Sequence, residues 1–266
     1  MKRTYARVML GPLRRRRPDE LPDRVLLREA VAVDRAHLAA YDRVCGFRLR
    51  DELPPTYPHV LAFPLALELM AGPFPFSPLG VVHIGNRIEQ DRPLRADAPL
   101  DLRVRAENLA PHPRGRQFEV VAEAAVGGAT VWRGRSTYLH REGSGGGGGR
   151  NDFEPPPLRA LWRVPGDVGR RYAAVSGDRN PIHMHPLAAR AFGQKGTIAH
   201  GMWTKARCLA ALEASLPSAF AVEVRFKTPL PLPGKAAFGT RGDEFYVWDA
   251  KSGRPVLDGR TSKAAG

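Results

Sequence analysis

A chain of 266 residues, 43% of them hydrophobic, can bury one large core or two ordinary ones, which excludes a wholly disordered protein. The formal net charge is +14, and such a basic chain suits nucleic acid, an anionic cofactor or an acidic carrier protein as its partner. No apolar run approaches the length of a membrane span, and no apolar block follows the basic N-terminus, so we expect neither a transmembrane segment nor a secretion signal.

The basic residues are spread along the whole chain. Only seven of the 41 are lysine, and the one compact block, Arg14–Arg17, is interpreted as a solvated tail. No zinc-finger, recognition-helix or aromatic-studded sheet pattern accompanies them, so nucleic acid is not the expected partner. The two cysteines, Cys45 and Cys208, stand in sequences typical of helices. We expect buried thiols without a disulfide, in a cytoplasmic protein.

The first half contains one apolar helix followed by strands. The helix is predicted over residues 58–72, "PHVLAFPLALELMAG", with Pro64 near its start or at a kink. Alternating apolar residues and turn residues then predict antiparallel strands over residues 81–88, 100–109, 116–126 and 129–139. A Gly-rich and Pro-rich segment, 141–157, follows as the one clear linker.

The second half repeats this plan. Its helix is predicted over residues 200–217, where apolar residues recur at helical spacing and Pro217 marks the end. Strands are predicted over residues 221–230, 235–241, 244–250 and 255–264. One long apolar helix with about five strands in each half indicates a curved sheet wrapped around a buried helix. Two such units can pair their edge strands into one continuous sheet.

The segment "SGDRNPIHMHPLAARAFGQKGTIAHGM", residues 176–202, carries the chemistry. Asp178 and His183 stand five residues apart across an Asn-Pro turn. A carboxylate and an imidazole that converge on one water molecule can take and deliver protons. His200-Gly201 then begins the apolar helix, where backbone N–H groups without partners and the helix dipole favour a developing negative charge.

This segment resembles the signature of the MaoC-like family, the (R)-specific enoyl-thioester hydratases and 3-hydroxyacyl-thioester dehydratases. The matching residues are Ser176, Gly177, Asp178, Asn180, Pro181, Ile182, His183, Ile198, Ala199, His200, Gly201 and Met202. The resemblance implies an α+β hot-dog fold. For the whole chain it implies a double hot-dog, with a degenerate repeat in residues 1–140, the linker in 141–157 and a catalytic repeat in 158–266.

The resemblance also implies an activity. The protein would be a hydro-lyase that reversibly hydrates (2E)-enoyl thioesters to (3R)-3-hydroxyacyl thioesters in fatty-acyl metabolism. Asp178 and His183 would form the catalytic dyad, and the Gly201 N–H would bind the thioester oxygen. Asn180 would tie the loop, and His200 would orient it. No further cofactor is expected, because CoA or phosphopantetheine arrives as part of the substrate.

Other expectations concern the cavity and metals. Apolar residues of the first half would shape the acyl-chain cavity: Phe63, Leu67, Met70, Phe74 and Phe76. Basic residues beside the signature would meet the anionic part of acyl-CoA or of an acyl carrier protein: Arg171, Arg179, Lys195, Lys205 and Arg207. The His183-Met184-His185 pair of histidines, with Asp178 and His200 nearby, could indicate a metal site, but His-x-His is a weak motif, and no metal is expected.

Two alternatives stay open at this point. One is a hot-dog thioesterase, and the other is a non-catalytic acyl-thioester-binding subunit of a heteromeric dehydratase. Retention of both Asp178 and His183 argues against the second. A double hot-dog can be complete as a monomer or can pair into a homodimer, and the sequence does not distinguish them.

Overall fold

The computed structural model describes residues 17–142 and 153–264, and within them ten strands form one antiparallel sheet. Their order across the sheet is β1-β3-β4-β5-β2-β7-β10-β9-β8-β6. The first half supplies β1 (Leu26–Val31), β2 (Val81–Gln90), β3 (Leu100–His112), β4 (Gly115–Val126) and β5 (Ala129–Arg141). The second half supplies β6 (Leu158–Val164), β7 (Phe220–Phe226), β8 (Gly234–Arg241), β9 (Glu244–Asp249) and β10 (Pro255–Ser262).

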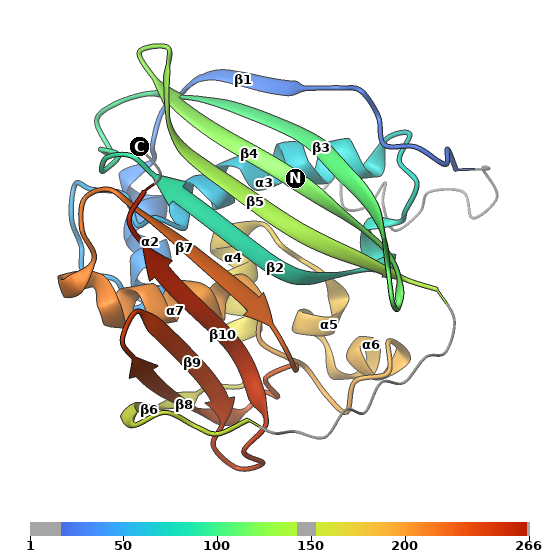
Figure 1. Ribbon diagram of the computed structural model, residues 1–266, viewed down its shortest axis with the longest axis vertical. Coiled ribbons are helices and arrows are strands. Elements are labelled where there is room, and N and C mark those ends of the chain that lie inside the picture. The colour runs from blue at the N-terminus through green and yellow to red at the C-terminus, as the bar shows by residue number, and fades with distance from the viewer. Residues whose placement is uncertain (1–16, 143–152, 265–266) are drawn as a thin grey trace.

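The two halves meet at the centre of the sheet. Strand β2 pairs with β7 from Gly85 opposite Arg225 to Gln90 opposite Phe220. The helices lie behind the sheet in Figure 1, with α3 (Tyr57–Ala71) behind the first five strands and α7 (Gly201–Leu212) behind the others. Each half is thus a sheet around a central helix, and edge pairing makes the sheet continuous. The predicted double hot-dog is confirmed.

Helix α3 is buried along most of its length because it is apolar on every side. Pro58 stands in its first turn, where a proline costs no hydrogen bond. Pro64 was predicted to lie near the start of the helix or at a kink. It lies inside the helix, seven residues after the first helical residue, Tyr57. Helix α7 ends at Leu212 and continues as a 3-10 turn over Glu213–Ser215, close to the predicted end at Pro217.

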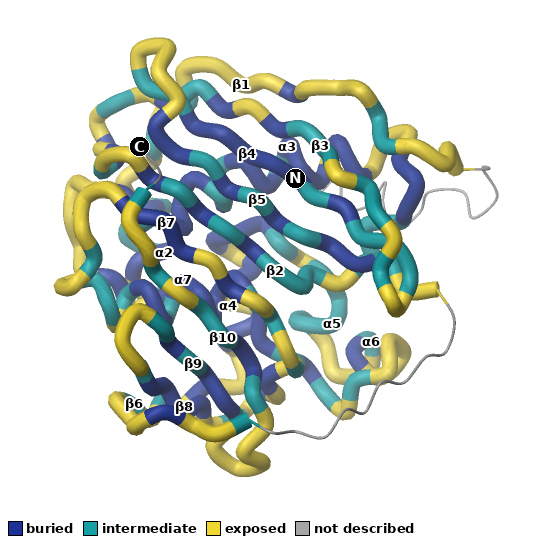
Figure 2. The backbone as a smooth tube through the Cα atoms, viewed as in Figure 1, coloured by how far each residue is buried: buried dark blue, intermediate teal, exposed yellow. Residues whose placement is uncertain are grey.

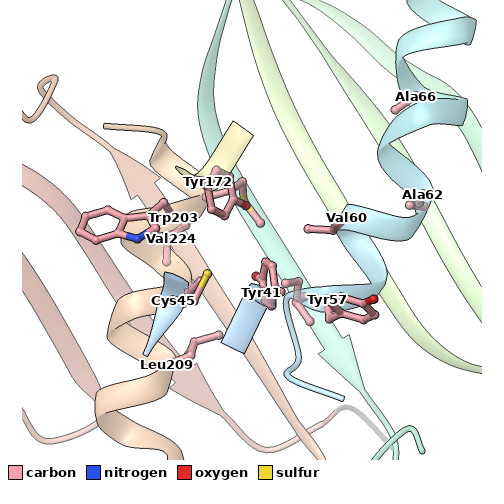
Figure 3. Packing of buried hydrophobic residues seen from close by; sticks show 14 of the residues in the cluster. Tyr41, Cys45, Tyr57, Val60, Ala62, Ala66, Tyr172, Trp203, Leu209 and Val224 are labelled. Carbon is pink, nitrogen blue, oxygen red and sulfur yellow. The ribbon is translucent and has the colours of Figure 1, made fainter. Parts of the chain in front are cut away.

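Four helices share one core between the halves. Figure 3 shows side chains of α3, α7, α2 (Arg35–Cys45) and α4 (Val168–Ser176) converging there. The Tyr41 and Tyr57 rings meet edge to face at 5.3 Å, and Trp203 Nε1 donates to the Val44 carbonyl at 3.0 Å. Both cysteines are buried and free, as predicted, and burial raises the pKa of each thiol.

Some expectations need correction or fall outside the structure. The edge strands β1 and β6 were missed, because most of their residues are exposed (yellow in Figure 2), apolar ones such as Leu27 and Leu161 among them. The short helix α5 (Pro181–Met184) was missed as well, and the short helix α6 (Pro186–Ala191) follows it. Arg14–Arg16 and the glycine run of the linker lie outside the described residues. In the part of the chain that is described, no helix has the length and apolar character needed to cross a membrane.

Candidate active site

The loop between α4 and α5 presents the acid of the predicted dyad. Helix α4 ends at Gly177, whose left-handed backbone (φ 76°) turns the chain. The Ser176 hydroxyl then accepts from the Asp178 N–H at 3.1 Å, and the Asp178 carboxylate accepts from the Asn180 N–H at 3.1 Å. These local bonds hold the acid on a short turn instead of a flexible loop.

Asn180 begins the next helix. Its side-chain oxygen accepts from the Ile182 N–H at 3.4 Å, and Pro181 fills the first helical position. His183 therefore projects from the first turn of α5, close behind Asp178. Asn180 thus links the loop that carries Asp178 to the start of α5.

The hydrogen bonds fix which nitrogen of His183 can act as a base. Nδ1 lies 2.8 Å from the Ile198 carbonyl oxygen, and a carbonyl only accepts, so Nδ1 carries the proton. Nε2 is left with a lone pair. Burial lowers the pKa of His183, and the nearby Asp178 opposes this only in part. The imidazole is neutral and ready to take a proton.

His200 stands against His183. Their ring centroids are 3.6 Å apart, and His200 Nε2 donates to the Asp178 carbonyl at 3.0 Å. Burial, and then the neighbouring His183, lower the pKa of His200 to about 3. Nitrogen and carboxylate atoms of Asp178, His183 and His200 lie within 4.8 Å of one another. His200 thus ties the start of α7 to the loop that carries the acid.

Gly201 begins α7 beside this cluster, with His200 as the capping residue. A Cβ atom on Gly201 would lie 2.9 Å from the ring of Phe226, so only glycine fits without displacing that ring. The first amides of a helix have no internal acceptor and carry the positive end of its dipole. The site therefore offers an acid, a neutral imidazole and a helix N-terminus facing one space.

That space is a cavity of about 510 Å³ with walls from both halves. The second half lines it with Asp178, His183, His200 and Gly201. From the first half, Phe63, Leu67 and Met70 line it, one face of α3, together with His59, His83 and Tyr138. Phe74 and Phe76 do not: both are buried against Phe118, at 5.0 and 5.4 Å between ring centroids, so placing them in the cavity was wrong.

Comparison with known proteins identifies the family of this chain. The MaoC like domain matches residues 162–238. The 3-hydroxyacyl-thioester dehydratase X of Mycobacterium tuberculosis is 41% identical over 252 residues, which cover 91% of this chain and 90% of that protein. The chain belongs to the MaoC-like family.

Solved structures agree with this assignment. The crystal structure of HtdX from Mycobacterium tuberculosis matches with a TM-score of 0.82 at 38% identity, over 90% of this chain and 100% of that one. A MaoC-like dehydratase from Phytophthora capsici shares the fold with a TM-score of 0.73 at 19% identity, over 91% of this chain and 96% of that one. The MaoC-like match in sequence lies in the second half, where Asp178 and His183 stand.

The basic rim differs from the one expected. Arg141 and Lys227 line the cavity and are exposed. Arg171, Arg179 and Lys195 are exposed but lie outside its walls. Two expectations are wrong: Arg207 stacks over Trp162 at 5.0 Å, and Lys205 is fully buried. Lysine and arginine on a helix look alike in sequence whether they face solvent or the sheet.

The histidines of the "HMH" pair have separate roles. His185 is exposed and caps α6, where its Nδ1 accepts from the Leu187 N–H at 3.3 Å. It does not join Asp178, His183 and His200, so three of the four residues considered for a metal set lie together and the inclusion of His185 was wrong. His83 and Tyr138 of the cavity wall gave no signal in the sequence, because they stand on strands and belong to no recognisable motif.

Proposed function

We propose that this MaoC-like protein reversibly hydrates (2E)-enoyl thioesters to (3R)-3-hydroxyacyl thioesters, and so acts as a hydro-lyase of fatty-acyl metabolism. The observation that carries the proposal is the meeting of Asp178, His183 and the N-terminus of α7 around one cavity. The similarity to a protein named 3-hydroxyacyl-thioester dehydratase X supports it.

Each group has a task in this reaction. The His183 Nε2 lone pair takes a proton from water as the water oxygen bonds to C3, and Asp178 orients that water. The proton taken from water is then delivered to C2, which returns the dyad to its starting state. C3 has gained the hydroxyl group and C2 the hydrogen, so one water molecule has been added. Meanwhile charge builds on the thioester oxygen, and the Gly201 N–H donates to it. Dehydration runs through the same steps in reverse.

The two halves have different roles in this proposal. The segment comparable to the start of α7 in the first half begins near His59 and has no Asp-x-Asn-Pro-x-His sequence before it, so residues 1–140 supply no second dyad. Instead Phe63, Leu67 and Met70 offer an apolar wall for the acyl chain. Residues 158–266 catalyse. Arg141 and Lys227 meet the phosphates of CoA or phosphopantetheine, and no other cofactor takes part.

The test follows two signals with crotonyl-CoA and a longer 2-enoyl-CoA. A hydratase removes the absorbance of the conjugated thioester and releases no free thiol. A thioesterase would release thiol at the rate at which substrate disappears. A binding subunit would change neither signal and yet bind acyl-CoA, which calorimetry would detect. Absorbance loss without thiol is the expected result.

A further inference from the structure

Lys205 is a buried cation that the proposed chemistry has not used. It stands on α7 four residues after Gly201, about one turn or roughly 6 Å along the helix axis. Its exposed fraction is 0%. Lysine is among the residues least often fully buried, since removing an ammonium group from water is costly.

The partners of Lys205 match the donors of an ammonium group. Nζ lies 2.6 Å from Asn86 Oδ1, 3.1 Å from the Asn86 carbonyl oxygen and 3.3 Å from the Val222 carbonyl oxygen. Three acceptors need three N–H donors, which only the ammonium form has. The Asn86 amide is oriented by its other end, because Nδ2 donates to the Ser136 hydroxyl at 3.1 Å.

No carboxylate is among the hydrogen-bond partners of the Lys205 ammonium group in the part of the chain that is described. Among the described residues, the three hydrogen-bond partners of Lys205 are all uncharged oxygens. More distant charges of both signs surround it, Glu223 on β7 and Arg87 on β2. Burial lowers the pKa of Lys205 well below its usual value, because an ammonium group loses its hydration there.

The charge acts on the cavity. Burial is the main cause of the lowered pKa of His59 and of His83, two residues of the cavity wall, and the nearby Lys205 lowers both further. Between Lys205 and the cavity lies protein interior, where a charge is screened far less than in water. Its field adds to the dipole of the same helix, whose positive end is at Gly201.

We propose that Lys205 is a positioning residue for the hydration reaction. Its ammonium group fastens α7 to β2 and β7, which sets the Gly201 amide, and its field stabilises the negative charge that forms on the thioester oxygen there. This inference rests on the proposed function, in which Gly201 binds that oxygen.

Two variants separate the charge from the packing. Lys205→Met keeps the length of the side chain and removes the charge. Asn86→Asp keeps Lys205 and an acceptor oxygen and neutralises the cation in place. The matched control is Lys195→Met, which removes an exposed lysine outside the cavity wall. The probe is cinnamoyl-CoA, whose absorbance band moves to longer wavelength when its thioester carbonyl is polarised.

We expect the wild type and Lys195→Met to move the band equally on binding. Lys205→Met and Asn86→Asp should move it less, with the Kd for the probe within about threefold, and should lower kcat roughly tenfold or more. Full band shifts and unchanged kcat in both variants would overturn the inference. If Lys205→Met does not fold, Asn86→Asp decides. A wild type that shifts the band but turns over no enoyl-CoA would contradict the proposed function instead.

Discussion

The α-carbon of Gly169 packs directly against the carbonyl group of His183, so that a Cβ atom added at Gly169 would collide with that oxygen. Gly169 lies in the first turn of α4, and His183 lies on α5. The same carbonyl belongs to the residue whose imidazole faces the cavity. The closeness of the two helices therefore sets where His183, the proposed base, stands.

Gly169→Ala should lower kcat by about 10- to 100-fold, because a shift of the α5 backbone of about 1 Å displaces His183 from its productive position. Alanine is otherwise a good helix residue, so the fold should persist. Gly196→Ala is the control, since a Cβ there meets nothing within 4 Å. Steady-state hydration assays compare the two, and equal rates in both variants would contradict this account.

Gly201→Ala should reduce kcat about tenfold or more, since the new methyl group would press on the Phe226 ring at the helix start that is proposed to bind the thioester oxygen. Shortening the neighbour should relieve the contact. We expect Phe226→Leu to recover part of the rate in the Gly201→Ala background. If the double variant is slower than Gly201→Ala alone, the steric explanation is wrong.

Arg141→Ser should raise KM for acyl-CoA several-fold at low salt and leave kcat nearly constant, because Arg141 lines the cavity and is proposed to meet the substrate's phosphates. The effect should be largest at low salt, since Arg141 is exposed and dissolved ions screen its charge. Lys227 is less suitable, since it is paired with Asp258 at 2.9 Å. Arg171→Ser, at an exposed position outside the wall, should leave KM unchanged. A KM effect of equal size in both variants would point to general charge attraction instead of a site.

Stability should fall as pH drops from about 6.5 to 5. Burial lowers the pKa of His59 to about 4 and of His83 and His200 to about 3, all below the usual 6.5. The unfolded chain then binds more protons than the native one, so acid favours unfolding. Asp42 acts the other way, because burial raises its pKa to about 7 and the native state holds its proton.

The histidines outnumber Asp42, so the melting temperature should decrease over this range. Thermal unfolding followed by circular dichroism at half-unit pH steps measures it. His83→Phe, which removes one of the depressed groups, should flatten the decrease. A melting temperature that is constant or higher at pH 5 would contradict the burial of neutral histidines.

Much of this fold was predictable from local pattern. The central helices and inner strands combine long apolar stretches with clear turns, and their boundaries were close. The edge strands β1 and β6 were not, because most of their residues are exposed and apolar ones such as Leu27 and Leu161 lie on the exposed side. The two central helices and the inner strands were therefore the elements that the sequence identified.

The candidate site divides in the same way. Asp178, His183 and Gly201 stand within one motif, and local turns bring them together. Lys205 could not be placed, since its burial depends on Asn86, 119 positions earlier in the chain. His83 depends on a strand irregularity: the register of β2 and β5 shifts between His83 and Gly85, and Ile84 has no place in that pairing.

The most direct test of the dyad compares Asp178→Asn and His183→Ala with the wild type in the hydration of crotonyl-CoA. Circular dichroism and the Kd of a saturated acyl-CoA would show that each variant is folded and binds. We predict that each loses at least about 10³-fold in kcat and keeps its affinity, because both groups act on the same water. A folded, binding-competent variant that keeps more than a tenth of the wild-type rate would contradict the assignment of the dyad.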